Sequence, residues 1–222
     1  MDYQHPIPFQ PEQYVCYRAA QPLHIDGRPD EEDWAAAPWT NDFVDIEGKL
    51  KPKPAYLTRV KMLWDTQYFY FAAELEEPHL WATLTERDAV MYQNDDFELF
   101  IDPDGDGQYY YEFEMNAHNA IWDLFLLRPY RVNDGLPKYL NNWDMKGIQT
   151  AVQLKGTLNN PADRDTGWTV EVAIPWSALS EMAPGTRPPK AGEQWRVNFS
   201  RVDWHFDIRE GSYHKKTDPK TG

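Results

Sequence analysis

The chain has 222 residues and a formal net charge of −14, with 36 acidic and 22 basic side chains. This balance excludes the basic stripe that neutralises phosphates, and it argues against nucleic acids and anionic membranes as partners. Aromatic residues make up 15% of the chain and include ten Trp, so some of them are expected to face solvent or a ligand rather than the core.

Residues 1–21 contain three prolines and are expected to form an extended arm over the domain. Residues 22–222 are predicted to form a single domain. The start of the chain lacks the basic and apolar regions of a signal peptide, and no apolar run approaches the ~20 residues of a membrane span. The lone cysteine, Cys16, has no intramolecular partner for a disulfide.

The pattern along the chain predicts strands with few helices. Asp30 is expected to cap a short helix whose Trp34 enters the core. Residues 58–65 alternate between apolar and polar, and residues 68–75 are apolar on both faces, which is typical of a central strand. Later strands are expected within 120–126, 148–154, 168–176 and 195–204. Nine or ten strands spaced by turn signals favour an all-β fold, an antiparallel β-sandwich with jelly-roll or immunoglobulin-like layering and short helical turns.

Residues 92–123 carry the most informative pattern. Two alternating runs flank a Gly/Asp-rich turn, which predicts a β-hairpin with one buried face. Glu98, Glu112, Glu114 and Asn116 recur at a spacing of two, so they are expected to stand on the face away from the core.

Carboxylates and amides beside aromatic rings suit a sugar, because pyranose C–H patches stack on rings while the hydroxyls need donors and acceptors. Candidate ligand-binding residues are Tyr92, Glu98, Glu114, Asn116, Trp122, Trp143, Arg201 and Trp204. A simpler interpretation stays open for some of them. Trp122 could belong to the core. The glutamates could be solvated and paired with Arg59, Lys61 or Arg128.

The turn between the two runs places Asp102, Asp104 and Asp106 at alternate positions. This spacing fits the opening of a calcium loop, although the flanks are strands and the twelfth position is Phe113. The alternative is an ordinary acidic hairpin turn.

Several motifs, in this order and spacing, resemble the family 9 carbohydrate-binding modules and their close relatives, over residues 23–204. They are Ile25-Asp26-Gly27 with Asp30-Glu31 and Trp34; Val60-Lys61-Met62-Leu63-Trp64-Asp65 before Tyr68-Phe69-Tyr70; Asp95-Asp96-Phe97-Glu98-Leu99-Phe100-Ile101-Asp102; Trp168-Thr169-Val170-Glu171-Val172-Ala173-Ile174-Pro175-Trp176; and Trp195-Arg196-Val197-Asn198-Phe199. The resemblance implies a non-catalytic β-sandwich that binds poly- or oligosaccharides, in the best-known members at the reducing ends of β-glycans, with bound calcium supporting the fold.

Carried over by position, Tyr92 falls where the family has one of two Trp residues that clamp the sugar. Glu98 falls on a carboxylate that hydrogen-bonds sugar hydroxyls. Glu114 falls near a sugar-binding Arg, which is a departure, and Asn116 follows it on the same face. The family's second clamping Trp lies in a late loop before a closing strand, and the chain stops at Gly222 before these are evident. The domain is therefore expected to lack its closing segment or to build the site differently.

Two other functions stay open at this point. Glu98, Glu112 and Glu114 could supply the carboxyl pair of a β-sandwich glycoside hydrolase. A haem-binding relative would need an axial pair such as Met115 and His118. The resemblance implies an extracellular or periplasmic location, while the lack of a signal peptide leaves a cytoplasmic one open.

Overall fold

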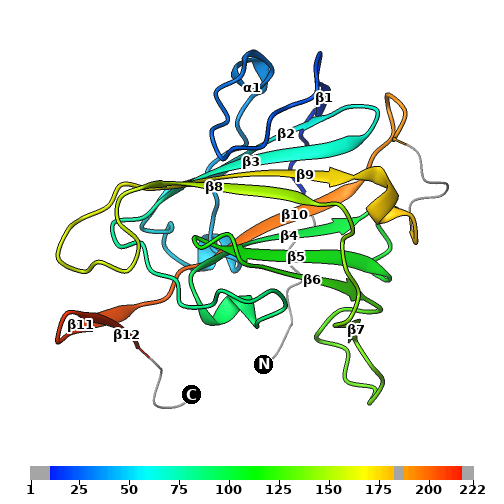
Figure 1. The fold of residues 1–222 in the computed structure, drawn as a ribbon. Coiled ribbons are helices and arrows are strands. Elements are labelled where there is room, and N and C mark those ends of the chain that lie inside the picture. Colours follow the sequence, from blue (N-terminus) through cyan, green and yellow to red (C-terminus); the bar gives the residue numbers. More distant parts are fainter. Residues whose placement is uncertain (1–10, 183–187, 217–222) are drawn as a thin grey trace.

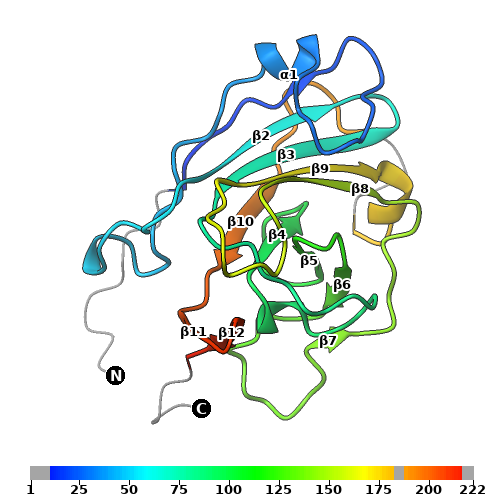
Figure 2. The same ribbon diagram turned by 60° about the vertical axis from the view of Figure 1, so that its left-hand side comes forward.

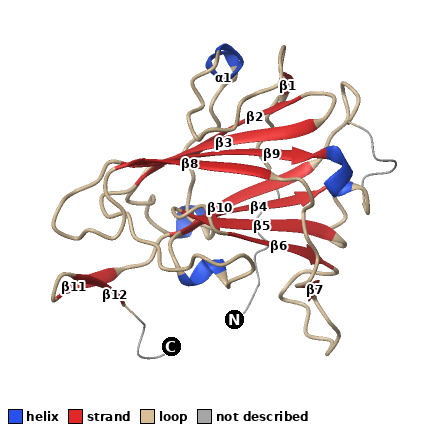
Figure 3. Ribbon diagram, viewed as in Figure 1, coloured by secondary structure: helices blue, strands red, loops and turns tan. Residues whose placement is uncertain are grey.

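The computed structural model describes residues 11–182 and 188–216, and it stacks two five-stranded sheets face to face (Figure 1). Strands dominate the part of the chain that is described, with only short helical segments between them (Figure 3). The predicted antiparallel β-sandwich is therefore confirmed. None of the helices in these two ranges has the length and apolar character needed to cross a membrane.

The first sheet has the strand order β1-β2-β3-β9-β8 and the second has β10-β4-β5-β6-β7. All neighbours pair antiparallel except β1 and β2, which run parallel. The strands of the first sheet are β1 (Tyr17–Arg18), β2 (Thr58–Trp64), β3 (Tyr68–Glu76), β9 (Gly167–Pro175) and β8 (Gln149–Lys155). Those of the second are β10 (Arg196–Val202), β4 (Asp96–Asp102), β5 (Tyr110–Asn116), β6 (Ile121–Leu126) and β7 (Tyr139–Leu140).

A separate hairpin of β11 (Phe206–Arg209) and β12 (Ser212–Lys215) follows the second sheet, and Figure 2 shows it beside the ends of that sheet's strands. The helical segments are α1 (Glu32–Ala36) and the 3-10 turns η1 (Gly48–Leu50), η2 (Met91–Gln93) and η3 (Trp176–Leu179). Asp30 does not cap α1, because the helix begins at Glu32 and its N-cap is Glu31, without a side-chain hydrogen bond.

The core lies between the sheets and is rich in aromatic rings. Phe71 from β3 packs against Phe97 from β4 and Phe113 from β5, with ring centroids 5.9 and 6.1 Å apart. The other face of β3 is also covered, since Tyr70 and Ala72 are buried in a second cluster with Trp34. The prediction of a central strand with two covered faces is thus confirmed.

Trp34 of α1 is fully buried and anchors this outer layer to β9. Its indole Nε1 donates to Glu171 Oε1 at 2.7 Å, and Glu171 Oε2 accepts from the backbone N–H groups of Asp26 and Gly27 at 3.1 and 3.0 Å. One buried carboxylate therefore satisfies three donors from two separate segments. Removing it would leave buried donors without partners, which costs more than the net value of a hydrogen bond.

We expect Glu171→Gln to lower the free energy of unfolding by about 2 kcal/mol, because the amide group presents an N–H₂ to donors that need an acceptor. Urea denaturation followed by Trp fluorescence measures this change. Glu86→Gln, at an exposed acid in a loop, is the control and should shift stability by less than about 0.5 kcal/mol. Equal effects of the two substitutions would contradict the anchoring role of Glu171.

Candidate functional site

The hairpin of β4 and β5 forms as the alternation predicts. Leu99 lies opposite Phe113 on the core face, and Glu98 lies opposite Glu114 on the outer face. Glu112 stands on the same outer face, two residues from Glu114 along β5. The predicted row of carboxylates on the face away from the core is therefore present.

This outer face holds a cavity of about 480 Å³, a size typical of sites for small ligands. Its base is made by the strands β4, β5 and β6, and its sides by η2 and by the segment that leads into β7. The residues that line it are Tyr92, Glu98, Phe100, Glu112, Glu114, Trp122, Tyr130 and Tyr139. Five rings and three carboxyl groups thus face one space.

The aromatic residues stand on two sides of the carboxyl groups. Tyr92 of η2 lies beside Trp122 of β6, with ring centroids 6.1 Å apart. Tyr130 and Tyr139 form a second pair at 5.9 Å, edge to face. Trp122 is almost buried, whereas the exposed fractions of the three tyrosines are 41–43%. The tyrosines are therefore the rings that are free to stack on a ligand.

Each glutamate on the outer face accepts one hydrogen bond from a neighbouring segment. Glu98 accepts from the hydroxyl of Ser200 on β10, and Glu112 accepts from the hydroxyl of Tyr130. Glu114 Oε2 accepts from the backbone N–H of Tyr92 at 3.1 Å. Hydrogen bonds thus join Glu112 and Glu114 to the segments that carry Tyr130 and Tyr92.

Burial raises the pKa of all three glutamates. The pKa of Glu112 rises to about 7, through burial and the charge of Glu98, against the hydrogen bond from Tyr130. That of Glu114 rises to about 10, through burial and then the charges of Asp96, Glu112 and Glu98. The pKa of Glu98 is also raised by burial, against the hydrogen bond from Ser200. A protonated carboxyl can donate as well as accept, so the cavity offers both kinds of group to hydroxyls.

Of the eight residues predicted to bind a ligand, four line this cavity: Tyr92, Glu98, Glu114 and Trp122. Asn116 shares their face but is fully buried, and its Nδ2 donates to the carbonyl of Leu84 at 2.8 Å. Trp143 packs on the core-facing rings of Tyr111 and Phe125, away from the outer face. The ion pairs considered for the glutamates do not form: Arg59 pairs with Glu74, Arg128 pairs with Asp134, and Lys61 donates to the carbonyl of Trp34.

Trp204 also lies outside the cavity but next to one of its sides. Its indole Nε1 donates to the carbonyl of Tyr92 at 2.8 Å, and the ammonium of Lys215 lies 3.2 Å from the ring centroid. Its backbone N–H donates to Asp95 Oδ1 at 2.7 Å. Trp204 therefore holds the segment that carries Tyr92.

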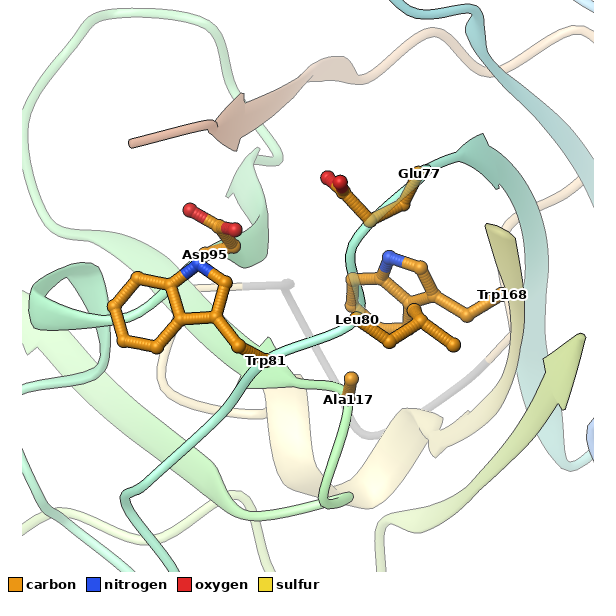
Figure 4. Close-up of a pocket in the computed structure, with 6 residues that line it drawn as sticks. All are labelled: Glu77, Leu80, Trp81, Asp95, Ala117 and Trp168. Carbon is orange, nitrogen blue, oxygen red and sulfur yellow. The ribbon is translucent and has the colours of Figure 1, made fainter. Parts of the chain in front are cut away.

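Arg201 is directed into the gap between the sheets. Its guanidinium donates to Glu77 Oε2 at 2.6 Å, to the carbonyl of Glu76 at 2.8 Å and to Thr58 Oγ1 at 3.1 Å. Glu77 also borders a small pocket with Asp95 and the indoles of Trp81 and Trp168 (Figure 4). That pocket is too narrow for a water molecule, so we assign the pair of Arg201 and Glu77 to support of the fold.

We expect Arg201→Met to destabilise the fold by about 3–5 kcal/mol, because it leaves the buried carboxylate of Glu77 without its cation. Urea denaturation measures the loss, and the double variant Arg201→Met/Glu77→Gln should recover part of it. Sugar affinity of the folded single variant should stay within about twofold of that of the unmodified chain. A large loss of affinity without a loss of stability would return Arg201 to the ligand site.

Glu112, Phe100, Tyr130 and Tyr139 line the cavity but were not among the predicted ligand-binding residues. The spacing of two already placed Glu112 on the outer face, and Phe100 follows from the same alternation on β4. No alternation in the sequence indicates the direction of Tyr130 and Tyr139, because the segment between β6 and β7 lacks periodicity.

A β-sandwich with a cavity of aromatic sides and carboxyl groups on one outer face has the form of a carbohydrate-binding module. The chain belongs to the carbohydrate family 9 binding domain-like family, which matches residues 25–198. The predicted family resemblance is thereby confirmed.

Solved structures share the fold. A Bacteroides uniformis protein proposed to bind carbohydrate superposes with a TM-score of 0.63 at 15% identity, over 91% of this chain and 87% of the other. A family 9 carbohydrate-binding module from Caldicellulosiruptor kristjanssonii, in complex with glucose, gives a TM-score of 0.53 at 19% identity, over 84% and 76% of the two chains.

Among curated proteins, the exoglucanase XynX of Acetivibrio thermocellus and the endo-1,4-beta-xylanase A of Thermoanaerobacterium saccharolyticum are each 26% identical over 121 residues, or 54% of this chain. The matched region covers only 9% and 8% of these proteins. The match thus spans less than a tenth of the length of each of these relatives.

Proposed function

We propose that this chain binds a β-glycan, or its reducing-end sugar, in the cavity on the outer face of β4, β5 and β6, and that it does so without catalysis. The observation that carries the proposal is the placement of two aromatic pairs, each with an exposed tyrosine, around a group of hydrogen-bonding carboxyls. The family supports carbohydrate binding, and the glucose complex of the Caldicellulosiruptor module supports a glucose-containing ligand.

Tyr130 and Tyr139 could take the place of the second clamping Trp of the family. Tyr92 stands where one clamping ring is expected, and the pair of Tyr130 and Tyr139 faces the carboxyl groups from the β7 side. A pyranose held between these sides would stack its C–H patches on a ring. Its hydroxyls would then reach Glu98, Glu112 and Glu114. No late loop beyond β10 is needed for this arrangement.

Affinity electrophoresis against soluble β-glucan, xylan and mannan, with reducing-end oligosaccharides as competitors, tests this proposal. Retardation by at least one polymer is expected, and competition by short oligosaccharides would place binding at chain ends. No retardation by any of the three would contradict it. The family favours binding over hydrolysis, so no new reducing ends should appear when the same polymers are incubated with the protein.

We expect Tyr92→Ala and Tyr139→Ala each to weaken sugar binding about tenfold, because each removes a stacking surface from one side of the cavity. Isothermal titration calorimetry with the best-retarded oligosaccharide measures the change. Tyr17→Ala is the matched control, since Tyr17 is an exposed tyrosine on β1 of the other sheet. Unchanged affinity in both cavity variants would show that Tyr92 and Tyr139 do not clamp the ligand.

We also propose calcium at the turn between β4 and β5. One carboxylate oxygen from each of Asp102, Asp104 and Asp106 lies within 4.8 Å of the other two, and Asp104 and Asp106 are exposed to solvent. This donor set fits calcium, which takes carboxylate and water oxygens. The carboxylate of Asp102 also stabilises the turn itself, since it accepts from the N–H groups of Gly105 and Gly107, each at 2.9 Å. These residues would hold the ion, and the ion would tie the two strands.

Saturating calcium should therefore raise the melting temperature by about 5–10 °C over the protein in EDTA, because the ion binds only the folded turn. Differential scanning calorimetry measures the shift. The double variant Asp104→Asn/Asp106→Asn should lose the part of the shift that the turn contributes, whereas Asp163→Asn, at an exposed acid of another loop, should keep the whole shift. A melting temperature that does not change with EDTA would show that residues 102–107 form an ordinary acidic turn without calcium.

The resemblance also supports an extracellular or periplasmic location, which stays a proposal.

A further inference from the structure

Three carboxyl groups converge between the cavity and the interior of the domain. Asp96 and Glu98 project from the same face of β4, and Glu114 projects from β5 directly opposite Glu98. One oxygen from each of the three lies within 4.8 Å of the others. Glu98 and Glu114 line the sugar cavity, while Asp96 lies behind them and is completely buried.

One oxygen of the buried Asp96 accepts no hydrogen bond from an N–H group or from a hydroxyl. Asp96 Oδ1 accepts from the backbone N–H of Val202 at 3.3 Å, but Oδ2 is buried without any hydrogen bond. No Lys or Arg within residues 11–182 and 188–216 forms an ion pair with Asp96, Glu98 or Glu114. Since a buried carboxylate without a counter-charge is strongly unfavourable, this oxygen calls for a cation or a shared proton.

On each side chain of the cluster, only one of the two oxygens accepts a hydrogen bond from an N–H group or hydroxyl. Glu98 Oε2 accepts from the hydroxyl of Ser200, and Glu114 Oε2 accepts from the N–H of Tyr92. The Oε1 atoms of both glutamates and Oδ2 of Asp96 accept from no N–H group or hydroxyl among the described residues, and the carboxyl of Glu114 is the polar neighbour of Asp96 in this cluster. Calcium binds oxygens at 2.3–2.6 Å, so its ligands lie at most about 5 Å apart, which matches the spread of the three carboxyls.

We propose that Asp96, Glu98 and Glu114 bind a calcium ion at the bottom of the cavity, and that the ion accepts neighbouring hydroxyls of the bound sugar as further ligands. The second half of this inference rests on the proposed sugar site. Calcium takes six to eight oxygens, so three carboxylates leave positions open toward the cavity. The ion supplies the positive charge that no Lys or Arg side chain supplies among the residues lining the cavity.

The test uses Asp104→Asn/Asp106→Asn as the parent protein, so that the acidic turn does not contribute. Terbium replaces calcium, and its luminescence is excited through the protein's Trp residues, of which Trp122 lines the cavity. Saturable luminescence that calcium displaces is expected. Asp96→Asn should weaken terbium binding at least tenfold, and Glu86→Gln, outside the cluster, should change it by less than twofold.

If Asp96→Asn does not fold, Glu98→Gln, at the more accessible edge of the cluster, carries the same expectation. Terbium binding that is absent, or equally strong in the parent and in these variants, overturns the proposal and favours a proton shared between Asp96 and Glu114.

Calorimetric titration with oligosaccharide, in calcium and in EDTA, tests the contact between ion and sugar. At least a tenfold weaker affinity in EDTA is expected. Equal affinities would overturn that contact while leaving the sugar site intact. Terbium bound at the cluster with no oligosaccharide binding in either buffer would support the metal site and reject the proposed function instead.

Discussion

The pairing of β4 with β5 is the constraint on which both the core and the cavity depend. Side chains alternate along a strand, so the register that packs Leu99 against Phe113 between the sheets also sets Glu98 across from Glu114 outside. A slip of one residue would bury both glutamates in an aromatic core. Because the hydrophobic packing fixes the register, it also fixes the spacing of the carboxyl groups that face the ligand.

This arrangement is costly, and the surrounding segments offset the cost. Carboxylates opposite each other on a sheet repel, and burial raises the pKa of Glu112 and Glu114 further. Ser200 from β10, Tyr130 from the segment before β7 and the N–H of Tyr92 each donate to one glutamate. Carboxyl groups with shifted pKa values that gather in a cavity are common at functional sites, and this cluster has a hydrogen bond from a different segment on each of its three glutamates.

The alternation in the sequence was sufficient to predict the hairpin, its two faces and the outward position of its glutamates. It was not sufficient for Arg201, which is predicted to bind the ligand because its guanidinium can donate to sugar hydroxyls. Arg201 pairs with Phe97, on the core-facing side of β4, whereas Ser200 pairs with Glu98 on the outer side. The register between strands a hundred residues apart follows from tertiary packing, so the sequence pattern did not reveal which of the two neighbours faces the cavity. Tyr130 and Tyr139 are not among the predicted ligand-binding residues for a related reason, since an irregular segment has no periodicity from which to infer the direction of a side chain.

The segment between β3 and β4 explains why residues on one face of the hairpin have different roles. Asn94 Oδ1 accepts from the N–H groups of Thr83 and Leu84, and Asn116 donates to the carbonyl of Leu84, so this segment folds over one end of the outer face. It buries Asn116 and Asp96 there and leaves Glu98, Glu112 and Glu114 facing the cavity.

The same segment carries Tyr92, whose carbonyl is held by Trp204. One loop thus buries the carboxyl group that lacks a partner and positions a ring on one side of the cavity. A cation at Asp96 and a sugar against Tyr92 would both bind residues that this loop covers or carries, so their binding would be coupled through it.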